Sequence, residues 1–246
     1  MIAIRSIIFN AAFYLWTAFM LVICTPVLAL DWRVTVRCQT FWANGVLRLM
    51  HALVGIALEV RGRENIGQYP VIIASKHQSA WDTLIWHVIV SSPAVVMKSE
   101  LLWIPFYGWY SLKAGMIPID RRGGAAALKA LIRSAQQAAK RQQPIIIFPQ
   151  GTRTAPGTQA PYQPGVVAIY RGLGMPVVPV ALNSGLFWPR RSLHRKPGTI
   201  VVEFLPQIEP GLKRGPFLAE LEDRIETATT KLELETQQKT LDFPTC

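Results

Sequence analysis

The sequence predicts an α/β fold, in which a mostly parallel sheet flanked by helices is preceded by a membrane-embedded helical pair at the amino terminus. Two observations carry this prediction. After Gly62, short apolar runs alternate with helix-length stretches, the pattern of a parallel sheet with crossover helices. Before it, the chain runs from Ser6 to Leu30 without one charged residue, which is long enough to span or embed in a bilayer.

The chain length fits one catalytic domain with a short accessory segment. Its 246 residues are too few for a large multidomain protein. Half of the residues are hydrophobic and the mean hydropathy is +0.24, which excludes a disordered chain and exceeds what one soluble core requires. We therefore expect membrane-anchoring helices in residues 1–57 and an α/β domain in residues 58–246.

The uncharged stretch 6–30 is interpreted as a retained membrane segment. A cleaved signal peptide is the alternative, but the stretch is long and lacks an Ala-x-Ala cleavage site. Residues 31–57 combine aromatic and aliphatic side chains with Arg33, Arg37 and Arg48, which predicts a second helix at a membrane interface. A core helix of the globular part is the alternative there, because both patterns look alike in sequence.

The body contains six apolar runs of strand length and four stretches of helical character. The predicted strands are 71–75, 94–98, 115–120, 144–149, 177–182 and 199–204, and the predicted helices are 81–90, 124–142, 165–172 and 217–236. The last helix is charged, with apolar residues at three- and four-residue steps, and is expected to close the domain.

The chain is basic, with 26 Lys and Arg against 15 Asp and Glu and a net charge of +11. Such a field attracts anionic lipid headgroups, acidic proteins or nucleic acid. Nucleic acid is disfavoured because the aromatic residues gather in lipid-suited runs instead of base-stacking strands. Cys24, Cys38, Cys246 and the four histidines lack disulfide-like or zinc-like spacing, so we expect reduced thiols and no metal.

A candidate catalytic segment, Lys-His-Gln-Ser-Ala-Trp-Asp at 76–82, directly follows the first predicted strand of the body. Loops at the carboxyl ends of strands commonly hold ligands. If Ser79 caps the next helix, His77 lies beside a positive dipole end that favours a neutral, proton-accepting imidazole, and Asp82 could orient the ring. The alternative is structural, since Ser79 and Asp82 also have the spacing of a capping box.

Two further strand exits carry residue types that suit an anion. Gly151, Thr152 and Arg153 offer accessible backbone amides, a hydroxyl and a planar guanidinium. Arg121 and Arg122 stand just before a predicted helix start. An ordinary strand-to-turn exit and solvated surface charges are the alternatives.

In this order, and followed by the apolar run 177–182, these blocks resemble the glycerolipid acyltransferase family, in particular its bacterial 1-acylglycerol-3-phosphate acyltransferases. His77 and Asp82 match the family's His, four residues, Asp motif. Residues 115–121 match Gly-x-x-Pro-Ile-Asp-Arg, and 148–153 match Phe-Pro-Glu-Gly-Thr-Arg except that Gln150 replaces the glutamate. The resemblance covers roughly residues 56–204.

The resemblance implies transfer of a fatty acyl group from an acyl thioester to the sn-2 hydroxyl of lysophosphatidic acid, giving phosphatidic acid. His77 would be the general base and Asp82 its orienting partner. The acceptor phosphate would be bound by the residues of the other two blocks, Arg121, Gly151, Thr152 and Arg153, with Gln150 also on the acceptor. No cofactor and no metal are implied.

The same resemblance and the charge pattern imply the setting of the reaction. Acyl-CoA or acyl carrier protein would be the co-substrate, and the phospholipid bilayer a partner. The expected location is a bacterial inner membrane, with the catalytic domain facing the cytoplasm.

Two alternatives stay open. The replacement of the family glutamate by Gln150 allows a different lyso-lipid acceptor, because it removes a charge from a position implicated in acceptor binding. A non-enzymatic lipid-binding protein would use the same basic surface and membrane segments. The aromatic segment 101–109 is either a wall for the acyl chain or part of the core.

Overall fold

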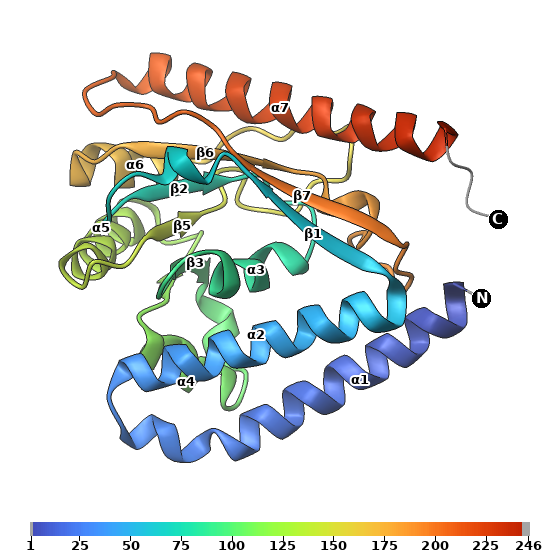
Figure 1. The fold of residues 1–246 in the computed structure, drawn as a ribbon. Helices are drawn as coiled ribbons and strands as arrows, with labels where there is room; N and C mark the ends of the chain where they lie inside the picture. Colours follow the sequence, from blue (N-terminus) through green and yellow to red (C-terminus); the bar gives the residue numbers. More distant parts are fainter. Residues whose placement is uncertain (1, 243–246) are drawn as a thin grey trace.

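A computed structural model describes residues 2–242 and places helices on both faces of one seven-stranded sheet (Figure 1). The strands are β1 (Ile56–Arg61), β2 (Ile72–Ser75), β3 (Ala94–Lys98), β4 (Ile117–Ile119), β5 (Ile145–Ile147), β6 (Val177–Leu182) and β7 (Gly198–Phe204). The helices are α1 (Ile2–Ile23), α2 (Trp32–Val54), α3 (Trp81–Ile89), α4 (Tyr107–Ala114), α5 (Gly124–Lys140), α6 (Pro164–Leu173) and α7 (Arg214–Asp242).

The sheet is mostly parallel, as the sequence predicts. Its strand order is β1-β7-β6-β2-β5-β3-β4, and the run from β6 to β4 is parallel throughout. β7 pairs antiparallel with β6, and β1 pairs parallel with β7, so these two strands run opposite to the others. The central strands β2 and β5 are covered on both faces, which is why they are almost wholly aliphatic.

Each face of the sheet has its own hydrophobic core. Met50 of α2 and Trp86 of α3 pack on one face, together with Phe9 of α1. Leu131 of α5 and Phe217 of α7 pack on the other face, where Phe217 stacks on Tyr170 at a centroid distance of 3.9 Å. Figure 1 accordingly shows α7 on the opposite side of the sheet from α1 and α2.

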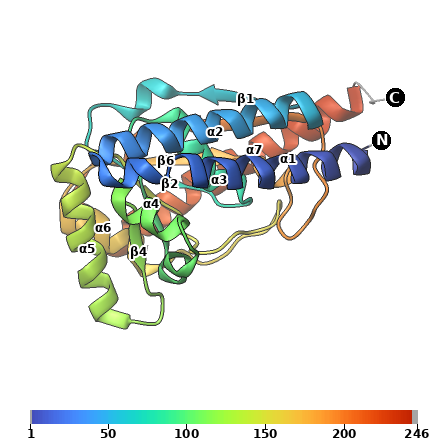
Figure 2. The same ribbon diagram turned by 90° about the horizontal axis from the view of Figure 1, so that it is seen from below.

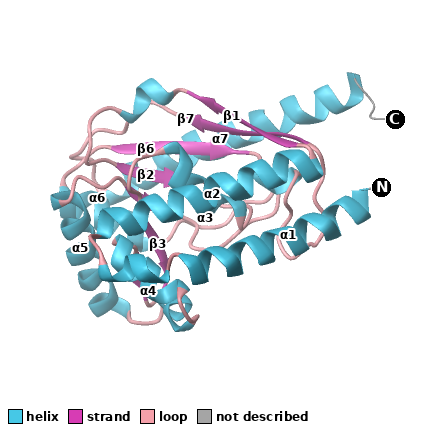
Figure 3. Ribbon diagram, turned by 60° about the horizontal axis from the view of Figure 1, so that its bottom comes forward, coloured by secondary structure: helices cyan, strands magenta, loops and turns pink. Residues whose placement is uncertain are grey.

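The two amino-terminal helices form an antiparallel hairpin that lies beside the sheet (Figures 2 and 3). A short 3-10 turn, Thr25–Ala29, joins them, and Asp31 caps α2 by accepting a 2.9 Å hydrogen bond from the Arg33 amide. α2 buries one face in the core that also contains Phe9 and Trp86. α1 has a mean hydropathy of 1.9 over its most apolar window, of which 17% is buried, so its length and composition permit a membrane span.

The boundary between the second helix and the α/β body differs from the prediction. The second helix ends at Val54, before the predicted end at residue 57, because Gly55 adopts a left-handed φ of 70° and the unpredicted strand β1 begins at Ile56. Segment 101–109, to which no secondary structure was assigned from the sequence, spans the end of a 3-10 helix, Ser99–Trp103, and the start of α4. The division into parts 1–57 and 58–246 stays a prediction.

Candidate active site

The sheet topology brings the predicted site residues together. β2 and β5 are neighbours, so the loops that leave their carboxyl ends, with His77 and Gly151 respectively, meet at one edge of the sheet. Arg121 follows β4 at the same edge, and Ser184 follows β6, the other neighbour of β2. Residues far apart in sequence therefore converge because parallel strands end at a common edge.

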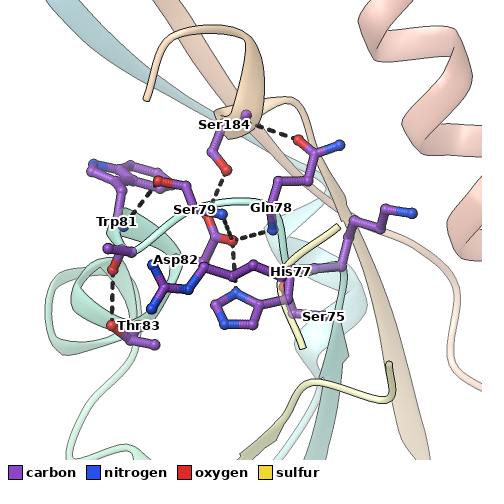
Figure 4. Close-up of polar contacts among 12 residues, drawn as sticks. Ser75, His77, Gln78, Ser79, Trp81, Asp82, Thr83 and Ser184 are labelled. Carbon is purple, nitrogen blue, oxygen red and sulfur yellow. Dashed lines mark hydrogen bonds and ion pairs between the residues drawn. The ribbon is translucent and has the colours of Figure 1, made fainter. Parts of the chain in front are cut away.

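His77 and Asp82 form a buried pair (Figure 4). The Nδ1 atom of His77 lies 2.9 Å from Oδ2 of Asp82, and Asp82 is fully buried. The five-residue spacing allows this contact because the chain turns in the loop 76–80 before α3 begins at Trp81. With Nδ1 directed at the carboxylate, the other ring nitrogen of His77, Nε2, is on the side of the ring away from Asp82.

Asp82 also organises the loop around the histidine. Its Oδ2 accepts from the amides of Gln78 at 2.6 Å and Ser79 at 2.8 Å, and its Oδ1 accepts from the Ser184 hydroxyl at 2.5 Å. Ser79 also makes contacts expected of the predicted capping box, since its amide donates to Asp82 and its Oγ accepts from the Trp81 amide at 3.1 Å, although the N-cap residue of α3 is Ala80. One carboxylate thus serves both the loop backbone and the imidazole.

The segment 148–154, which follows β5, also contacts His77. The His77 ring stacks on Phe148 at a centroid distance of 4.1 Å. The His77 amide donates to Oε1 of Gln150 at 3.3 Å, and the His77 carbonyl accepts from the Thr154 amide at 2.8 Å. The loops after β2 and β5 are therefore joined through backbone as well as side-chain atoms, which fixes where the ring sits.

One cavity of about 1110 Å³ contains the predicted site. Its lining includes the predicted site residues His77, Arg121, Gln150, Gly151, Thr152 and Arg153, whereas the buried Asp82 is not part of it. Arg122 is not part of the lining; its amide donates instead to Oδ1 of Asp120 at 2.8 Å. Gln150 is only 2% exposed, and both polar atoms of its side chain have protein partners, Nε2 donating to Glu226 at 3.1 Å.

Arg190 and Arg191 also line this cavity, and the sequence prediction missed them. They lie in the loop between β6 and β7, and Arg190 Nη1 donates to the carbonyl of Arg153 at 2.8 Å. The signal was present, because an Arg-Arg pair follows the predicted strand 177–182 at the same sheet edge. Seven residues separate the pair from the end of that strand, so the sequence alone does not place it at the strand exit.

The far part of the cavity is apolar. Met20 of α1, Trp42 of α2, Leu84 of α3 and Tyr110 of α4 line it. Leu101, Ile104 and Tyr107 of the segment 101–109 line it as well, so that segment forms part of the cavity wall. The cavity combines a cationic part near His77 with an apolar part between the helices, which suits an amphiphilic ligand.

The described cysteines form no disulfide, and the described residues hold no cluster of metal-ligand type. Cys24 and Cys38 are free thiols, and Cys246 lies outside the described residues. Within residues 2–242, no three His, Cys, Asp or Glu side chains gather as metal ligands would.

The fold and the site together define an acyltransferase. The family model described as Acyltransferase matches residues 57–183, and the chain belongs to this family. A 1-acyl-sn-glycerol-3-phosphate acyltransferase of Pseudomonas aeruginosa is 33% identical over 98% of this chain and 96% of its own length. A 1-acyl-sn-glycerol-3-phosphate acyltransferase alpha of Homo sapiens is 30% identical over 81% of this chain and 71% of its own length.

A solved structure confirms the fold. The crystal structure of the 1-acyl-sn-glycerophosphate (LPA) acyltransferase from Thermotoga maritima superposes with a TM-score of 0.77 at 20% identity. The match covers 95% of this chain and 98% of that chain. The predicted architecture of a mostly parallel sheet with flanking helices is confirmed.

Proposed function

We propose that this acyltransferase transfers a fatty acyl group from an acyl thioester to the sn-2 hydroxyl of lysophosphatidic acid, giving phosphatidic acid. One observation carries the proposal: the His77–Asp82 pair and the guanidinium groups of Arg121 and Arg153 line or adjoin a single cavity with an apolar extension. The activity in the names of the relatives from Pseudomonas aeruginosa and Homo sapiens agrees with it.

In the proposed reaction, His77 is the general base. Its Nε2 takes the proton of the acceptor hydroxyl while that oxygen attacks the thioester carbonyl, and Asp82 stabilises the imidazolium through Nδ1. When the tetrahedral intermediate collapses, the carbon–sulfur bond breaks and the leaving thiolate takes the proton from Nε2. The products are the ester and the free thiol, and the histidine returns to its neutral state.

The acceptor phosphate is assigned to Arg121, Arg153, Thr152 and the backbone at Gly151. Gly151 has a φ of 65°, and a Cβ placed there would lie 2.9 Å from Cγ of Gln163, so both the turn and the space favour glycine. Guanidinium groups bind phosphate through two parallel hydrogen bonds, which orients the acceptor as well as holding it. The cavity position of these groups beside His77 supports the assignment.

The donor is proposed to be acyl-CoA or acyl carrier protein, with no further cofactor. Both donors are acidic, and the net charge of +11 favours their approach. The apolar part of the cavity, between α1, α2 and α4, is of a kind that accommodates an acyl chain.

Membrane association is proposed through the exposed apolar side chains of α1. Leu15 is 71% exposed and Val22 68% exposed, values that suit contact with lipid. The bacterial inner membrane, with the catalytic domain facing the cytoplasm, is the proposed location because lipid substrate and thioester donor meet there. The division into anchoring helices 1–57 and a catalytic domain 58–246 belongs to the same proposal.

The proposal is tested by following thiol release and lipid product with a panel of acceptors. Lysophosphatidic acid should turn over with acyl-CoA, acyl carrier protein or both, whereas monoacylglycerol, which lacks the phosphate, should not. Turnover confined to acceptors without a phosphate monoester would contradict the assignment. Because Gln150 is engaged with protein groups, we expect no switch to another lyso-lipid headgroup.

A further inference from the structure

A buried polar cluster lies behind His77, on the side of the loops that faces α7. The ammonium of Lys76 lies 2.5 Å from Oε2 of Glu226, and Lys76 is only 1% exposed. Oε1 of the same carboxylate accepts from Nε2 of Gln150 at 3.1 Å and from the Tyr162 hydroxyl at 3.0 Å. The carboxylate of Glu226 therefore contacts the loops after both β2 and β5.

Gln150 connects this carboxylate to the backbone of His77. Its Oε1 accepts from the His77 amide at 3.3 Å, and its Nε2 donates to Glu226. An amide side chain is the residue type that accepts at one end and donates at the other. A second α7 carboxylate acts on the same loop, since Glu233 accepts from Nε2 of Gln78 at 2.6 Å and from the Gly157 amide at 3.0 Å.

The charges of this cluster balance only if position 150 is neutral. Lys76 supplies one positive charge and Glu226 one negative charge, and both are nearly excluded from water. A glutamate at 150 would place a second carboxylate about 3 Å from Glu226, and like charges in a buried site repel strongly. Tyr162 is no counter-charge: burial first, and Glu226 second, raise the pKa of its hydroxyl, so it stays a neutral donor.

We infer that Glu226 of α7 is a positioning residue for His77, acting through Gln150, and that glutamine at 150 is matched to that carboxylate. This inference rests on the proposed function, because His77 is taken to be the general base. It assigns Gln150 to the support of the catalytic loop and not to the acceptor. Glu226 lies outside the motifs that define the site, on a helix that covers the opposite face of the sheet from α2.

The test is a charge exchange between the two positions. We compare the wild type, Gln150→Glu, Glu226→Gln and the double variant, measuring kcat and the KM for lysophosphatidic acid and for acyl-CoA by thiol release. Asp223→Asn, an exposed carboxylate of the same helix, is the matched control. Melting temperatures are recorded for all five proteins.

Each single variant disturbs the charge balance, so kcat should fall about tenfold or more, with each KM within about twofold of wild type. The double variant again has one carboxylate and one amide beside Lys76, in exchanged positions, and should regain kcat to within about threefold of wild type. Asp223→Asn should behave as wild type. If a single variant does not fold, recovery of melting temperature and kcat in the double variant carries the same conclusion.

Two results would overturn the inference. One is a double variant no better than the worse single variant in kcat and melting temperature. The other is a Gln150→Glu variant with unchanged kcat and a tenfold higher KM for lysophosphatidic acid, which would place Gln150 on the acceptor. A wild type that does not turn over lysophosphatidic acid would instead refute the proposed function. In that case the melting temperature of the double variant would still show whether positions 150 and 226 are coupled.

Discussion

Asp82 accepts hydrogen bonds from four groups, two of them loop amides, and has no exposed surface. Its carboxylate therefore shapes the loop and orients the His77 ring with the same atoms. From the sequence alone, a capping box and a catalytic partner are alternative roles for Asp82. The structure combines them, because the carboxylate turns back from the first turn of α3 to accept from the Ser79 amide and from His77 with the same oxygen.

Replacing Asp82 by Asn tests this double role. The amide accepts through one oxygen where two now serve four donors, and it lacks the negative charge that stabilises the imidazolium of His77. We expect kcat per folded molecule to fall about a thousandfold or more, together with a loss of about 2–4 kcal/mol in the free energy of unfolding. Thiol-release kinetics below the melting temperature, with denaturant unfolding alongside, separate the two effects. A normal kcat in the folded variant would make Asp82 purely structural.

His87, one of the α3 residues that line the cavity, makes stability depend on pH. Burial lowers its pKa from the ordinary 6.5 to about 4, so the unfolded chain binds the proton more readily than the folded protein. Stability from this group is fully present above about pH 6.5 and is lost as the pH falls toward 4, by about 3 kcal/mol.

We therefore expect His87→Phe to lose less stability than wild type on acidification. Urea unfolding at several pH values between 7 and 4 gives the difference directly, because the other acid-titrating groups are shared by both proteins. Equal losses in the two proteins over this range would show that His87 does not carry the effect.

At the scale of single residues, the sequence identified residues that the structure brings to one cavity, but it did not identify the residues that support them. His77, Arg121 and Arg153 stand in short motifs at strand ends, where residue type and position both point to chemistry. Glu226 carries no such signal, because a glutamate in a charged helix resembles any solvated residue. Its role depends on which helix face meets the loops, and only the tertiary structure sets that.

At the scale of elements, strands that are buried on both faces were predicted closely. β3 and β6 have the bounds that their apolar runs predict. β1 was missed because Glu59 and Arg61 interrupt its apolar pattern, and these two residues form an ion pair on an edge strand. The reversal of β7 was not predictable either, since strand direction depends on the path of the connecting loop and not on local residue pattern.

Arg190, in the loop between β6 and β7, is expected to contribute to substrate binding. Arg190 adds a guanidinium to the cavity and braces the carbonyl of Arg153. Arg190→Ala should raise the KM for one anionic substrate about tenfold, with kcat changed by less than about threefold, and the effect should shrink at high salt. Separate titrations of lysophosphatidic acid and acyl-CoA show which substrate the group binds.

The control for this loop is Arg133→Ala, which removes an exposed arginine of α5 outside the cavity lining. It changes the net charge by the same amount, so any general electrostatic effect appears in both variants. Unchanged KM values for both substrates in Arg190→Ala would remove this loop from the site.

At the scale of the whole molecule, exposed apolar side chains extend beyond α1 to the segment around α4. Trp103 is 87% exposed and Trp109 57% exposed. α4 is tied to the end of α1 by a 2.9 Å hydrogen bond from the Tyr110 hydroxyl to the Leu21 carbonyl. These tryptophans therefore flank the apolar part of the cavity, in a position suited to the headgroup layer of a membrane.

If this region contacts lipid, the double variant Trp103→Ser, Trp109→Ser should bind less tightly to anionic phospholipid vesicles, by about tenfold or more in partition. Vesicle co-sedimentation measures this directly. Turnover of a short-chain, water-soluble lysophosphatidic acid should change little. Leu234→Ser, an exposed apolar residue on α7, is the control. Equal partition of the double variant and the wild type would exclude this segment from the membrane contact.

The central claim is that one imidazole, held by Asp82 in a cavity with the phosphate-binding guanidinium groups, removes the acceptor proton. The most direct measurement is kcat of His77→Ala for thiol release, with saturating lysophosphatidic acid and acyl-CoA. The account predicts a fall of about a hundredfold or more, with lysophosphatidic acid binding within about threefold of wild type. A folded His77→Ala protein with the kcat of the wild type would contradict it.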